Sequence, residues 1–186
     1  IPTTGGSSGV KVLKQGFNVD PILQKQAHCI STMTYNEYWQ VVDAGLSPSD
    51  LTVYKYEDQG VATLEDGLYV MEDRLNDPKF VNRMARFLRA SKRGWEYSGW
   101  YPDRAAAIVL ENDDTGAQTE KHQRRMMREI NRLVSVGEQS NGIGFLEPYD
   151  YNRTVKVLLA SDSDPVITKE PKGAWTHKVY EAMNNL

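Results

Sequence analysis

The chain has 186 residues, of which 40% are hydrophobic and 25% are charged, and its formal net charge is −3 at pH 7. The mean hydropathy of −0.57 and the 10% of aromatic residues exclude an intrinsically disordered chain, which has fewer aromatic residues and a larger net charge. The acidic balance also argues against nucleic acid as a partner, because phosphate contacts require a basic excess.

The cysteine and histidine content argues against metal or redox chemistry. Cys29 is the only cysteine, so the chain has neither an internal disulfide nor a Cys-x-x-Cys pair. The histidines, His28, His122 and His177, do not share the spacing of a zinc site, and we expect them to be surface or helix-packing residues. We therefore predict no metal site and no cofactor. No apolar run reaches the length of about 20 residues that a membrane span requires.

Strand and helix patterns alternate in the first third of the chain. Asp20-Pro21 is a typical helix start, and a second helix is predicted over residues 35–44, closed by Gly45. Strands are predicted before, between and after these helices, over residues 10–13, 29–33 and 51–56. This order predicts parallel α/β units.

The remainder of the chain is predicted to be mostly helical. Two short strand patterns, over 61–64 and 68–71, precede a long helix that opens at Asp77-Pro78 and carries an apolar stripe. Further helices are expected to begin near Pro102, Thr119, Pro148 and Thr176, ending near Leu110, Val134, Leu159 and the C-terminus.

Two stretches resemble one known family. They are Tyr56-Glu57-Asp58-Gln59-Gly60-Val61 and the run from Arg89 to Tyr97, which reads RASKRGWEY. The chain resembles the solute-binding proteins of ABC importers for nitrate, sulfonates, taurine and the pyrimidine precursors of thiamine. The matched order of elements covers roughly residues 10 to 135.

The resemblance implies an α/β, two-lobed, type II periplasmic-binding-protein-like fold with the ligand bound between the lobes. Residues 1–57 would be the remainder of lobe two, and residues 58–186 the hinge and the return into lobe one. Because complete members are longer, we expect this chain to be a C-terminal fragment that lacks the N-terminal part of the fold. An exposed sheet edge would then favour an oligomer or a weakly structured monomer.

The strongest candidate for ligand binding is the stretch that opens the helix at 35–44. Tyr35, Asn36 and Glu37 follow a predicted strand, and open α/β sheets bind ligands at the carboxyl ends of their strands. An aromatic ring, an amide and a carboxylate suit a pyrimidine with an exocyclic amine, and pyrimidine-precursor binders have a similar run here. The alternative is that Asn36 and Glu37 only cap the helix and that Trp39, a weaker candidate, packs in the core.

Weaker candidates lie near the predicted hinge. Gly60 supplies the free φ that a hinge requires, and Asp58 beside it either contacts a ligand amine or closes a turn. Thr63 and Asp66 complete the predicted ligand-binding set.

The resemblance implies a protein that captures a small polar or heteroaromatic solute, presents it to an ABC transporter permease and catalyses nothing. It implies a periplasmic location, or an extracellular one with a lipid anchor. One alternative is an enzyme like the pyrimidine-precursor synthases of a related eukaryotic branch, and another is a helical interaction module. The latter would use a basic stripe on the helix from Thr119, namely Lys121, Arg124, Arg125, Arg128 and Arg132, which otherwise is a solvated face or a permease-docking surface.

Overall fold

The computed structural model describes residues 9–135, 141–160 and 165–186. The chain divides into two compact units, each assembled from two stretches of sequence. The first unit comprises Ile1–Thr52 and Asp103–Ile130, and the second comprises Val53–Pro102 and Asn131–Leu186. The predicted boundary between residues 57 and 58 stays a prediction.

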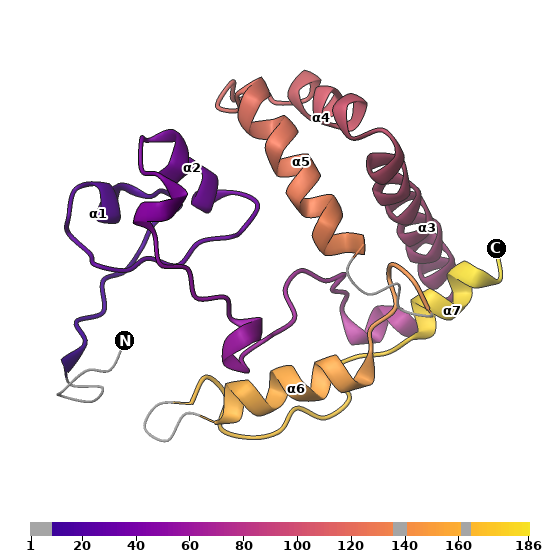
Figure 1. The fold of residues 1–186 in the computed structure, drawn as a ribbon. Coiled ribbons are helices and arrows are strands. Elements are labelled where there is room, and N and C mark those ends of the chain that lie inside the picture. The colour runs from indigo at the N-terminus through magenta and orange to yellow at the C-terminus, as the bar shows by residue number, and fades with distance from the viewer. Residues whose placement is uncertain (1–8, 136–140, 161–164) are drawn as a thin grey trace. The chain divides into compact units, whose positions relative to one another are not determined.

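The first unit contains the helices α1 (Asp20–Leu23) and α2 (Glu37–Asp43), all but the first residue of α4 (Pro102–Glu111), and most of α5 (Glu120–Ser135) (Figure 1). A short 3₁₀ turn, η2 (Pro48–Asp50), follows α2 and is capped by Ser47. Ala105, Ala106 and Met127 form a small buried cluster between α4 and α5.

The second unit is organised around the long helix α3 (Pro78–Trp100). It also contains α6 (Pro148–Leu159), α7 (Lys178–Asn184), and the 3₁₀ turns η3 (Glu57–Gln59) and η4 (Glu72–Asn76). Helix α7 packs along α3 (Figure 1), where Val81, Ala85, Val179 and Met183 are buried.

The predicted helices are confirmed. The residues that signal the start of a helix lie at its own first turn, so these signals are local. Helix α3 begins at Pro78, and the side chain of Asp77 caps it by accepting a hydrogen bond from the amide of Lys79 at 2.9 Å. Proline also opens α4 and α6, at Pro102 and Pro148. Proline fixes φ near its helical value and has no amide hydrogen to leave unpaired in the first turn.

The predicted α/β fold is wrong for the residues that the structure describes. They contain helices and turns but no strand, so the two-lobed α/β fold has no sheet on which to form. The strands expected over residues 10–13, 29–33, 51–56, 61–64 and 68–71 are extended or irregular chain instead.

Side chains satisfy some of the backbone groups that a neighbouring strand would have bonded. The Gln15 amide donates to the carbonyl of Ser31 at 2.9 Å and accepts from the amide of Ser31 at 3.0 Å, as a paired strand would. In the second unit, Arg153 of α6 donates to the carbonyl of Ala62, and Thr154 accepts from the amide of Leu64. A strand is stable only when its backbone groups are paired, and here helix and loop side chains supply that pairing.

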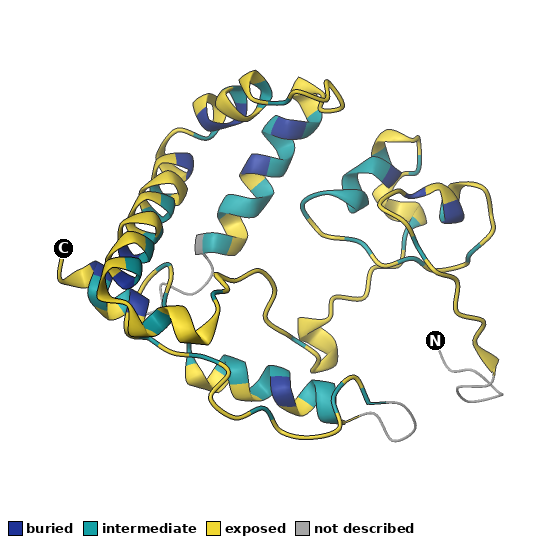
Figure 2. Cartoon of the chain, turned by 180° about the vertical axis from the view of Figure 1, so that it is seen from behind, coloured by how far each residue is buried: buried dark blue, intermediate teal, exposed yellow. Residues whose placement is uncertain are grey.

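Burial is limited in both units (Figure 2). None of the large side chains in the described ranges is fully buried. The apolar stripe predicted on α3 is only partly covered, because Phe87 is 55% exposed and Trp95 is 40% exposed. Apolar area left in water contributes no hydrophobic stabilisation, so each unit leaves apolar surface available to a partner.

Candidate functional site

A polar contact joins α2 to α5 inside the first unit. The Oδ1 atom of Asn36 lies 2.9 Å from Nε2 of His122 and also accepts a hydrogen bond from Nε2 of Gln40 at 3.0 Å. The amide nitrogen of Asn36 donates to Oε1 of Glu37 at 3.1 Å. All four side chains are half-buried, so each hydrogen bond is partly shielded from water.

An open pocket of about 610 Å³ lies over this contact, and all its lining belongs to the first unit. Its polar lining comes from α2 and from the start of α5 and is made up of Asn36, Gln40, Asp43, Gln118, Thr119 and His122. Its volume falls within the range of small-molecule sites, about 300–1,000 Å³. The pocket combines amides, an imidazole and one carboxylate, which can recognise a small solute by hydrogen bonds.

Asp43 forms two ion pairs at the edge of the pocket. Its carboxylate oxygens lie 2.9 Å from Nζ of Lys121 and 3.0 Å from the guanidinium of Arg125. The hydrogen bond from Lys121, with further help from Arg125, holds the pKa of Asp43 below its ordinary value despite some desolvation. The pocket therefore keeps an ionised carboxylate whose charge is offset by two cations.

Tyr35 and Trp39 are not part of the pocket lining. Tyr35 is half-buried in the turn before α2. The Trp39 ring contacts Tyr38 edge-on, with 5.0 Å between centroids, and the Arg125 guanidinium lies 4.6 Å from its centroid. Its indole nitrogen is buried without a hydrogen-bond partner. Trp39 is half-buried, and its role in ligand binding stays a prediction.

Glu37 has both carboxylate oxygens in use. Oε2 accepts from the amide of Met33 at 2.9 Å, and Oε1 accepts from Asn36. Glu37 therefore helps to close the first turn of α2 and orients the Asn36 amide. Its role as a direct ligand contact stays a prediction.

The other predicted ligand residues belong to the second unit. Asp58, in η3, and Thr63 and Asp66, in the extended chain that follows, are exposed. Asp66 has a φ of 42°, and Gly60, at the end of η3, has a φ of 75°. The structure thus places Asn36, of the predicted set, in the pocket lining, and it places these three residues in the other unit. Their roles in ligand binding stay predictions.

Sequence reasoning missed the contribution of α5 to the pocket. His122 was expected to be a surface or packing residue, and it lines the pocket and bonds to Asn36, 86 residues away. The sequence signal for His122 as a pocket residue was weak, because a single histidine on an amphipathic helix is usually structural.

Four of the five cations of the basic stripe on α5 form ion pairs with acidic neighbours within the first unit. Arg124 lies 2.9 Å from Asp103 and 2.8 Å from Glu120, and Arg128 lies 3.3 Å from Asp103. Lys121 and Arg125 pair with Asp43, as described above. These pairs reduce the surface charge that the stripe offers to a partner.

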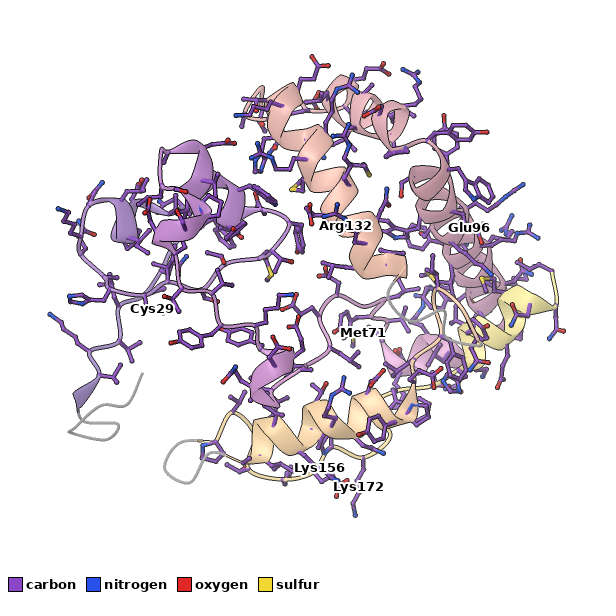
Figure 3. The ribbon with its side chains drawn as sticks, in the orientation of Figure 1. Cys29, Met71, Glu96, Arg132, Lys156 and Lys172 are labelled. Atoms are coloured by element: carbon purple, nitrogen blue, oxygen red, sulfur yellow. The ribbon has the colours of Figure 1, made fainter. Side chains whose placement is uncertain are left out.

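Across the described ranges, His, Cys, Asp and Glu side chains do not gather in threes as a metal ion would require. Cys29 is exposed on the irregular chain between α1 and α2 (Figure 3), and its thiol lies 3.9 Å from the carbonyl of Ile30. None of the described helices combines the length and the apolar character that a membrane crossing needs.

The sequence of residues 3–105 matches the model of the NMT1/THI5-like family. The match spans more than half of the chain, and the protein therefore belongs to this family. No curated protein matches the chain, and no solved structure matches it.

Proposed function

We propose that this protein is the substrate-binding component of an ABC transporter and that it captures a small polar or heteroaromatic solute. Membership of the NMT1/THI5-like family supports a role in ligand binding. The observation that carries the proposal is the pocket over the Asn36–His122 contact, because it includes a residue that the sequence singled out independently.

The pocket in the first unit is the proposed binding site. Asn36 and Gln40 supply amide groups, and His122 supplies a ring nitrogen, so a ligand can be oriented by several weak bonds. A single unit with this pocket does not require closure of two lobes. The proposal therefore does not depend on the α/β fold that the structure contradicts.

The proposal includes three further statements about the cell. The protein performs no chemistry on the solute, it lies in the periplasm or is held outside the cell by a lipid anchor, and it delivers the solute to a membrane permease. Cell fractionation tests the location, and purification under mild cross-linking tests association with the permease. Chromatography of solute recovered after incubation tests for catalysis, because a converted product would refute the first statement.

Ligand binding is tested with a panel of aminopyrimidines, alkylsulfonates, taurine and nitrate. The expected result is a rise in the thermal unfolding temperature with at least one member, because a ligand that binds only the folded state stabilises it. Asn36→Ala should abolish that rise, and Asn112→Ala, at an exposed position just after α4, should keep it. A panel without effect on the wild-type protein would refute the proposed function.

We also propose that the chain self-associates through its exposed apolar segments. Tyr69 is 87% exposed and Met71 is 73% exposed, and both lie on extended chain before η4 (Figure 3 labels Met71). Extended chain with exposed apolar side chains favours association with another copy. Light scattering should show an oligomer that a Tyr69→Lys, Met71→Lys double variant weakens, and a wild-type monomer at high concentration would refute this.

A further inference from the structure

One side of helix α3 carries cations that have no acidic partner among the described residues. Arg83, Arg86 and Arg93 follow one another at spacings of three and seven residues, which brings them to the same side of the helix, and Lys79 lies about one turn before them. All four side chains are exposed, and none of them forms an ion pair with a described residue. Together they form a surface that we call the cationic face of α3.

Exposed aromatic rings accompany the cationic face. Phe87 is 55% exposed, and Tyr97, one turn after Arg93, is 38% exposed. Exposed positions run along α3 (Figure 2), while another side of the helix packs against α7. A surface of cations and rings fits a partner that is acidic and partly apolar, because such a partner pairs the charges and covers the rings.

Residues 56–73 of the second unit, which we call the acidic segment, have this complementary character. The segment contains no lysine or arginine, and its carboxylates are exposed and form no ion pair with a described residue. Tyr69 and Met71, which are 87% and 73% exposed, lie between its second and third acidic pairs. These pairs are Glu57 and Asp58, Glu65 and Asp66, and Glu72 and Asp73.

The acidic segment is long enough to lie along the cationic face. From Arg83 to Arg93 helix α3 rises about 15 Å, at about 1.5 Å per residue. The chain from Asp66 to Glu72 spans up to about 20 Å when it is extended. The second and third acidic pairs can therefore reach both ends of this stretch of α3, with the apolar side chains between them against the rings.

We propose that the cationic face of α3 binds the acidic segment of a second copy of this chain, an inference that rests on the proposed self-association. A second copy satisfies both surfaces at once, whereas an anionic lipid surface would pair the cations and repel the acidic segment. The contact joins two different surfaces, so each copy keeps one of them for a further copy. Because the charges lie at the surface, dissolved salt screens the contact.

The first test reverses the charge of the cationic face. Light scattering should show that the wild-type protein associates more weakly at about 500 mM than at about 50 mM sodium chloride. At the lower salt concentration the triple variant Arg83→Glu, Arg86→Glu, Arg93→Glu should associate at least about tenfold more weakly, because attraction becomes repulsion at three positions.

A matched control separates this contact from the effect of net charge. The triple variant Lys14→Glu, Lys169→Glu, Lys172→Glu changes the net charge equally at exposed positions outside α3, and it should associate like the wild-type protein. Figure 3 labels Lys172.

An exchange of charges between two chains tests the pairing directly. The variant Glu65→Lys, Glu72→Lys, Asp73→Lys should associate weakly by itself, because its segment then repels the cationic face. Mixed in equal amounts with the α3 variant it should form a complex, because the new lysines of one chain meet the new glutamates of the other. Two different chains must meet in this mixture, so a contact within one chain cannot produce the result, and the recovery also shows that both variants are folded.

Three results would overturn the inference and leave the proposed self-association in place. They are a wild-type oligomer that the α3 variant leaves intact, a control variant that loses association equally, and a mixture of the two charge-reversed variants that does not recover. The last result would assign the cations to another acidic partner, such as an anionic lipid surface. A wild-type monomer at high concentration would instead refute the self-association and the inference together.

Discussion

Gly144 lies directly against Leu88 of α3. A Cβ atom placed on Gly144 would lie 3.0 Å from Cδ1 of Leu88, which is closer than real Cβ atoms usually approach another carbon. Gly144 also has a φ of 94°, in the left-handed region that side chains disfavour. Both facts require glycine where the chain before α6 passes over α3.

We therefore expect Gly144→Ala to destabilise the protein more than Gly173→Ala does. Gly173 has a φ of 62° with nothing within 4 Å of an added Cβ, so its substitution reports backbone strain alone, about 1–2 kcal/mol. The contact with Leu88 should add at least about 1 kcal/mol at Gly144. Urea denaturation measures both, and equal losses would show that Leu88 moves aside without cost.

Removal of the Asn36 side chain should loosen the contact between α2 and α5. Asn36→Ala leaves Gln40, His122 and Glu37 half-buried, each without its Asn36 partner. We expect a loss of about 1–3 kcal/mol in the free energy of unfolding, because unsatisfied polar groups are costly. Asn112→Ala, which removes one exposed hydrogen bond to Ile108, is the control and should cost less. Similar losses in the two variants would contradict this account.

Glu37→Gln separates helix capping from ligand contact. The substitution removes the charge and one of the two acceptors that serve Met33 and Asn36, so unfolding free energy should fall by about 1 kcal/mol. Affinity for 2-aminopyrimidine should change less than about tenfold, because both oxygens are already occupied by protein donors. A larger loss of affinity at unchanged stability would instead support a direct ligand contact, as the sequence predicted.

Asp43 should make the protein less stable in acid. Its folded pKa is lowered, first by the hydrogen bond from Lys121, so its contribution is present above the unfolded pKa of about 3.9 and is lost as pH falls through the folded value. The pairs are partly solvent-exposed, so the contribution should stay below about 1 kcal/mol. Denaturation at about pH 7 and about pH 3 should show a smaller decline for Asp43→Asn than for the wild type. The exposed Asp58→Asn should behave like the wild type, and an unchanged decline in Asp43→Asn would contradict the assignment.

The sequence predicted the helices and part of the candidate site. Asp77-Pro78 predicts the start of α3, because a capping side chain and a proline act on the first turn alone and need no distant partner. Asn36 was identified from its place at the start of a predicted helix and from the resemblance to pyrimidine-precursor binders, although the strand predicted before it does not form in the described residues. These features depend on interactions between residues a few positions apart.

Only the tertiary structure showed that the described residues form no sheet and that His122 is the partner of Asn36 on α5. A strand pattern shows which side chains alternate, but the pairing of strands depends on segments that are distant in sequence. Here side chains of Gln15 and α6, and not a second strand, bond to the extended backbone. His122 reaches Asn36 across 86 residues of chain, and no local pattern encodes that separation. Composition and periodicity therefore determined where helices form, and long-range packing determined which polar side chains share a pocket.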